Sequence, residues 1–140
     1  MNLQRDNYSR YLRLGYEDEH TLLAANNYAL SLISLRRFEE AKSLMRKTIP
    51  VAQRVLGKSH VNTLRMRLNY AMALYKDDGA MLDDLREAVT TLEETASTFR
   101  RILGGAHPNV EGIETSLCNS RWMLIEREIV LRGCANGFDV

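Results

Sequence analysis

The chain has 140 residues, of which 45% are hydrophobic and 26% are charged, as in an ordinary soluble domain. Its formal net charge of +1 gives no electrostatic reason to expect nucleic acid or an anionic membrane as a partner. Cys118 and Cys134 stand far apart, and neither a signal peptide nor a membrane span is predicted, so we expect a cytoplasmic protein without a disulfide framework or zinc site.

Apolar residues recur at three- and four-residue steps along the whole chain, which predicts an all-α fold. Residues 8–14 look like the end of a helix whose partner is missing. Helices are then predicted over residues 19–34 and 38–56, joined by a tight turn, and Gly57 is expected to end the second in the left-handed conformation. Pro50 falls inside this second helix and should kink it, for no functional reason that the sequence reveals.

Two more helices are predicted over residues 61–77 and 85–103, and Gly104 follows the second. Asp84 and Glu87 have the spacing of a capping box at its start. Pro108 suits the first turn of one further helix, which should continue through Trp122 to about residue 132 and end at Gly133. No helix is predicted after it.

These helices form repeated units. Leu-Gly recurs at positions 14, 56 and 103, so the units are 42 and 47 residues long. Asn-Tyr-Ala recurs at 27–29 and 69–71, and the five extra residues of the second unit fall in the 76–84 connection. We therefore divide a single domain, residues 1–140, into repeat one (14–55), repeat two (56–102), a half repeat or cap (103–132) and a tail (133–140).

The pattern Leu-Gly-x-x-His-x-x-Thr-Leu in residues 56–64, with Asn-Tyr-Ala and Phe-Glu-Glu-Ala, resembles the long-helix tetratricopeptide repeats of kinesin light chains and their relatives. The resemblance covers about residues 14–123. It implies a right-handed superhelix of antiparallel helix pairs, an α-solenoid of about two and a half repeats, and a protein that is not an enzyme. The chain departs from the pattern at Asp18, where the later units have His60 and His107, and at Glu114 and Arg121, where apolar residues are expected.

One stripe of each first helix is predicted to pack against neighbouring helices, because small side chains recur there and permit close approach. The small column consists of Ala29, Ala71 and Cys118. The other packing residues of the first helices are Ala25, Tyr28, Leu32, Tyr70 and Leu74. Those of the second helices are Phe38, Ala41, Met45, Leu85, Ala88, Leu92 and Phe99.

The other stripe of the first helices matches the positions that, in the resembled family, line a concave groove for an extended peptide. It comprises Leu23, Asn26, Asn27, Leu30, Ile33, Arg65, Leu68, Asn69, Met72, Tyr75, Lys76, Ser116, Asn119 and Trp122. Asparagine suits this role because its amide both donates and accepts hydrogen bonds. The alternatives are solvated asparagines, packing of Trp122 on its own helix, and a merely solvated surface at Arg65 and Lys76.

The three histidines do not indicate catalysis or a metal. His60 and His107 occupy equivalent positions at helix starts, where capping explains them, and the acidic 77–84 connection lacks the pattern of a calcium loop. No cofactor is expected.

The leading interpretation is an adaptor that binds a protein or peptide partner. The alternative is a structural module that self-associates through unpaired ends, with Tyr8, Tyr11 and Leu12 at the front and Ile125, Ile129 and Val130 at the back. Glu114 and Arg121 would be costly to bury unpaired, which favours a monomer or a weak homodimer.

Overall fold

The computed structural model describes residues 2–13 and 18–135, and within them it contains helices joined by turns and no strand. The helices are α1 (Asn2–Arg13), α2 (Glu19–Ser34), α3 (Phe38–Val55), α4 (Val61–Tyr75), α5 (Leu82–Leu103) and α6 (Pro108–Ala135). The predicted all-α class is confirmed. The first Leu-Gly pair, at residues 14 and 15, and the last five residues of the predicted tail lie outside the described ranges.

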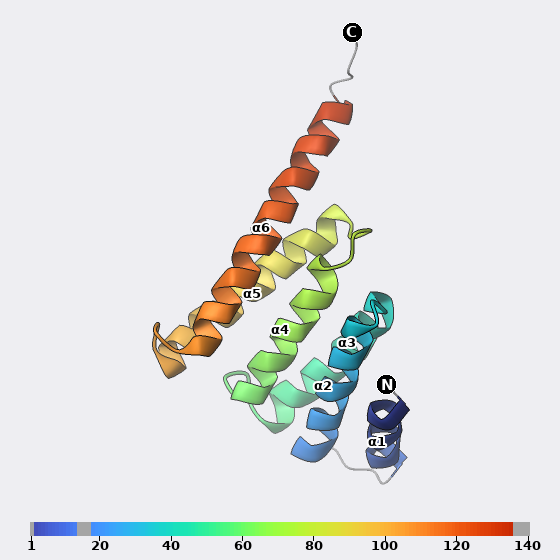
Figure 1. Ribbon diagram of the computed structural model, residues 1–140. Helices are drawn as coiled ribbons and strands as arrows, with labels where there is room; N and C mark the ends of the chain where they lie inside the picture. The colour runs from blue at the N-terminus through green and yellow to red at the C-terminus, as the bar shows by residue number, and fades with distance from the viewer. Residues whose placement is uncertain (1, 14–17, 136–140) are drawn as a thin grey trace.

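Each helix packs against the next one, and contacts also join α2 to α4 and α4 to α6. The helices α2, α4 and α6 therefore lie side by side in one layer, with α3 and α5 in a second layer behind them (Figure 1). The short α1 packs against α2 much as α3 packs against α4. This stacking of helix pairs confirms the α-solenoid that the resemblance implies.

Local backbone features end the helices where the sequence indicates. Gly57 and Gly104 have φ values of 100° and 84°, which glycine adopts without the strain of a side chain. Between α2 and α3 the backbone turns at Arg36, with φ 58°, and the Arg37 N–H donates to the Leu32 carbonyl at 2.8 Å. The predicted turn at residues 35–37 is thereby closed by the helix's own carbonyl groups.

Two predicted helix boundaries are wrong. The capping box is not formed, because α5 begins at Leu82, so that Asp84 lies in the first turn instead of before it. An acidic residue is favourable in that turn through the helix dipole, and the Asp84 carboxylate accepts from the Lys42 ammonium of α3 at 3.4 Å. At the other end, α6 continues through Gly133 to Ala135, since a glycine inside a helix costs only about 1 kcal/mol relative to alanine.

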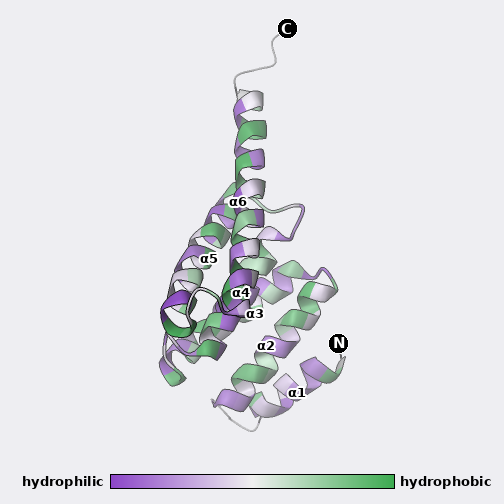
Figure 2. Ribbon diagram, turned by 60° about the vertical axis from the view of Figure 1, so that its left-hand side comes forward, coloured by the Kyte–Doolittle hydropathy of each residue, from purple (hydrophilic) through white to green (hydrophobic). Residues whose placement is uncertain are grey.

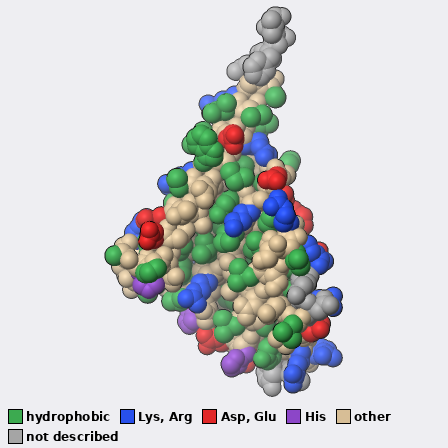
Figure 3. Space-filling view, in the orientation of Figure 1, with side chains coloured by type: hydrophobic (Ala, Val, Ile, Leu, Met, Phe, Trp, Pro, Cys, Tyr) green, Lys and Arg blue, Asp and Glu red, His purple; other side chains and the backbone are tan. Residues whose placement is uncertain are grey.

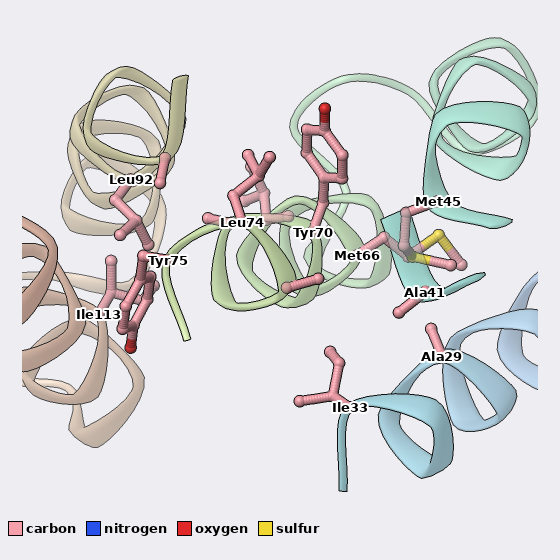
Figure 4. Close-up of a cluster of buried hydrophobic side chains, with 14 of the residues drawn as sticks. Ala29, Ile33, Ala41, Met45, Met66, Tyr70, Leu74, Tyr75, Leu92 and Ile113 are labelled. Carbon is pink, nitrogen blue, oxygen red and sulfur yellow. The ribbon is translucent and has the colours of Figure 1, made fainter. Parts of the chain in front are cut away.

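The core fills the space between the two layers. Of the predicted packing residues, Ala25, Ala29, Leu32, Ala41, Met45, Ala71, Leu74, Leu85, Ala88, Leu92 and Phe99 are at most 1% exposed. Figure 4 shows Met66 of α4 beside Met45 and Ala41 of α3, close to Ala29 of α2. Pro50 lies on the exposed side of α3, inside an unbroken helix, and the kink expected there remains a prediction.

Cys118 is the exception among the small-column residues, because it is exposed instead of packed. Its counterparts Ala29 and Ala71 lie on helices that are each followed by a second helix of the same unit, and that helix covers them. Within the described residues no helix follows α6, so nothing covers Cys118. The exposed side of α6 is prominent because the helix projects beyond all the others (Figure 2).

Candidate functional site

The residue before each first helix caps it. The Asp18 carboxylate accepts from the Thr21 N–H at 3.1 Å, and the Nδ1 atoms of His60 and His107 accept from backbone N–H groups two residues on, at 3.1 Å and 3.2 Å. These bonds satisfy donors that the start of a helix leaves without partners. The capping role predicted for both histidines is confirmed, and Asp18 fills the same role with different chemistry.

The predicted groove residues divide into three groups by burial. Asn27, Leu30, Arg65, Lys76, Asn119 and Trp122 are exposed; Leu23, Leu68, Met72 and Ser116 are half-buried; Asn26, Ile33, Asn69 and Tyr75 are buried. All of them lie on α2, α4 or α6 except Lys76, which directly follows α4. The structure thus brings them into the same layer of helices, but it gives only the first two groups access to a ligand.

The buried asparagines pair with each other. The Asn69 side-chain amide donates to the Asn26 side-chain oxygen at 2.6 Å, and both residues are at most 9% exposed. The expectation that Asn69 is an exposed counterpart of Asn27 is therefore wrong. Because α2 packs directly against α4, the asparagine facing Asn69 is Asn26, one residue earlier in the repeat.

Further polar contacts join the two units between residues that are 42 or 43 positions apart. The Asn62 amide donates to Glu19 at 2.9 Å, and Arg36 pairs with Asp78 at 3.1 Å. Lys42, only 4% exposed, bonds both Glu39 and Asp84. Burial lowers the pKa of Lys42, but the bonds and charges of these two carboxylates outweigh it and hold the pKa above its usual value.

A tyrosine between the two layers belongs to a polar cluster. Arg46 of α3 donates to the Tyr70 hydroxyl at 3.0 Å, and that hydroxyl donates to Glu87 of α5 at 2.6 Å. Burial and the bond to Glu87 raise the pKa of Tyr70 to about 12, against the opposing effect of Arg46. Sequence reasoning predicted Tyr70 as a packing residue and missed this cluster, because it assigned Glu87 to the capping box.

A hollow of about 390 Å³ lies on the exposed side of α6, where it meets the end of α5. Its lining includes Leu117, Cys118, Trp122 and Ile125. Trp122 is 66% exposed. Figure 3 shows hydrophobic and charged side chains mixed along α6 as a whole.

The charges expected to stand unpaired on α6 have partners on α5. Glu114 accepts from the Nε of Arg100 at 2.9 Å, and Arg121 pairs with Glu93 at 3.0 Å. The expectation of a cap rests on the cost of burying two isolated charges. That cost does not apply here, because both charges have partners.

The described residues offer neither a metal site nor a membrane span. They contain no group of three or more His, Cys, Asp or Glu side chains that could hold a metal ion. Among them, no helix is sufficiently long and apolar to cross a membrane.

Comparison with known proteins gives one finding. Residues 20–79 match a family model described as tetratricopeptide repeat, which spans α2, α3 and α4. The match supports a tetratricopeptide repeat protein, and such repeats form a non-enzymatic scaffold family that generally mediates interactions between proteins. The searches of curated proteins and of solved structures gave no match.

Proposed function

We propose that this chain is an interaction scaffold of the kinesin-light-chain-like type, which binds an extended peptide across α2, α4 and α6. The observation that carries the proposal is the set of exposed groove residues on three helices that lie side by side in one layer (Figure 1). The long units of 42 and 47 residues support the light-chain-like subtype. Two exposed free cysteines, Cys118 and Cys134, favour a cytoplasmic location.

The exposed and half-buried groove residues offer complementary kinds of contact. Asn27 and Asn119 can pair with a peptide backbone, since an amide donates and accepts. Leu30 and the half-buried Met72 provide apolar contact, and methionine adapts well to different side chains. Lys76 adds positive charge, so the ligand we propose is an extended segment with apolar and acidic residues.

A phage-displayed library of random peptides tests this function. Peptides selected on the wild-type chain should lose at least tenfold in affinity when Asn27, Leu30 and Lys76 are all replaced by alanine. The matched control replaces Ser97 and Arg101, which are exposed on α5, and should bind as the wild type does. Equal binding to both variants, with unchanged melting temperatures, would show that the peptides bind elsewhere.

Self-association through an unpaired end is the second candidate function. At the back, Ile125, Ile129 and Val130 are each more than half exposed on α6. At the front, Tyr8 packs against Tyr28 with their ring centroids 6.1 Å apart, so less of that end is open. The observations therefore favour the end formed by α6.

A further inference from the structure

The outer side of α6 corresponds to a side of α4 that is fully covered. At the 47-residue offset of the second and third units, Ala71 corresponds to Cys118 and Leu74 to Arg121. On α4 these positions are 0% exposed, because α3 and α5 pack there. On α6 both positions are exposed. The fold therefore presents a side of a helix that elsewhere in the chain receives another helix.

The apolar residues on this side form a regular stripe. Cys118, Trp122, Ile125 and Ile129 follow one another at steps of four, three and four, which is the spacing of the seam between two paired helices. We call these four residues the α6 seam. Trp122, Ile125 and Ile129 are 66%, 51% and 64% exposed. The buried Ile113 lies on the other side of the helix, whereas the buried Leu117 borders the seam at the hollow.

We infer that the α6 seam binds the α6 seam of a second copy of this chain, with the two helices antiparallel. This inference rests on the second candidate function, self-association. In an antiparallel register, Trp122 faces the partner's Ile125, and Cys118 faces the partner's Ile129. Every apolar residue of the seam then meets another apolar residue, and each large Trp lies against a smaller Ile. A parallel pair would instead place both tryptophans in one layer.

Charges beside the seam support the antiparallel pairing. Arg121 and Glu128 flank it on the side of α5, seven residues apart and with opposite signs. The antiparallel register brings Arg121 next to the partner's Glu128, twice by symmetry. Arg121 already pairs with Glu93, and Glu128 with Arg86 at 3.6 Å, so the partner would extend two existing pairs into an alternating network.

The size of the seam sets the expected strength. The paired seams would form four layers of side chains. We expect such an interface to bury at most roughly 1,200 Å², which is the lower end for stable interfaces. We therefore expect a dimer with a micromolar dissociation constant.

Sedimentation of the full chain over a range of concentrations tests the inference. We expect a reversible dimer and, because Trp122 is the single tryptophan, a blue shift of its fluorescence as the dimer forms. Ile125→Asp with Ile129→Asp should raise the dissociation constant at least a hundredfold while the circular dichroism stays unchanged. The matched control Leu131→Asp changes an apolar residue of α6 that is 46% exposed and lies outside the seam, so this variant should still dimerise.

A short bismaleimide tests the register in a Cys134→Ser background. Adding Ile129→Cys should allow cross-linking to the partner's Cys118, whereas the background alone should give no cross-linked dimer. Cross-linking of the background alone would indicate a parallel pair and overturn the register. A dimer that survives both aspartates would overturn the seam but leave self-association standing. A monomer at every concentration would refute both. The peptide site is tested separately at Asn27, Leu30 and Lys76, which lie outside the seam.

Discussion

The second unit and the lone helix α6 place equivalent residues in opposite environments. Tyr75 of α4 is 5% exposed and lies beside Ile113, whereas its counterpart Trp122 is 66% exposed (Figure 4). Ala71 is fully buried, and its counterpart Cys118 is exposed. A position in the repeat therefore does not by itself determine burial. Burial is determined by the next helix in the stack, and repeat units therefore depend on their neighbours for stability.

The largest expected difference in stability is between a variant at Leu74 and a variant at its counterpart Arg121. Leu74→Ala should lower the free energy of unfolding by about 2–5 kcal/mol, because it leaves a cavity among fully buried side chains. Arg121→Ala removes an exposed ion pair with Glu93 and should cost less than about 1 kcal/mol. Urea unfolding of both variants measures the contrast, and equal losses would contradict it.

The second contrast depends on pH. Tyr70 has a raised pKa in the folded chain, whereas its counterpart Leu117 cannot ionise. The pKa of Tyr70 is about 10 in the unfolded chain and about 12 in the folded chain. Its contribution to the free energy of unfolding is therefore complete below about pH 10 and is lost as the pH rises through about 12. Two pKa units correspond to at most about 3 kcal/mol.

Tyr70→Phe should therefore lose less stability between pH 10 and pH 12 than the parent does. The raised pKa of Lys42 is common to both chains, so the difference between them isolates the tyrosine. Unfolding curves recorded at several alkaline pH values make the comparison. Parallel losses in parent and variant would show that the Tyr70 cluster is not coupled to folding.

The covered side of α4 and the open side of α6 should also respond differently to a larger side chain at the same repeat position. Ala71→Leu should destabilise by about 1–3 kcal/mol, because the added methylene groups have no space between packed helices. Cys118→Leu should change stability by no more than about 0.5 kcal/mol, since the side is open. Thermal melting at low protein concentration decides this, and an Ala71→Leu variant that melts like the parent would show that the faces are assigned wrongly.

The smallest expected effect distinguishes two neighbouring asparagines. Asn69→Ala leaves the buried Asn26 without its partner and should cost about 1–2 kcal/mol. Asn27→Ala removes an exposed side chain and should cost almost nothing. If the two variants had equal stability, the Asn26–Asn69 bond would contribute nothing to the joining of the units.

Periodicity and repetition predicted most of the fold. The spacing of apolar residues placed the helix pairs and the packing residues Ala29, Leu74 and Phe99, because a 3.6-residue period is visible in sequence. Repetition also placed the caps His60 and His107, since the same position starts a helix in both units. These features depend on local geometry, which the sequence carries directly.

The candidate site was predicted less completely. A repeat alignment shows that Asn27 and Asn69 are equivalent, but burial depends on the neighbouring helix, and the packing of α4 against α2 places Asn69 against Asn26. In the same way, the small column predicted a buried Cys118, although burial there requires a covering helix, and the described residues contain none after α6. Packing between segments that are distant along the chain leaves no pattern in the local sequence from which it could be predicted.

The most direct test of the account is the rate at which Cys118 reacts with a thiol reagent, measured in a Cys134→Ser background over a range of protein concentrations. An open side of α6 that receives a second copy predicts fast labelling when the chain is dilute and slower labelling as the dimer forms. Slow labelling even at the lowest concentration would mean that α6 is already covered within one chain. That result would contradict both the open seam and the contrast between α4 and α6.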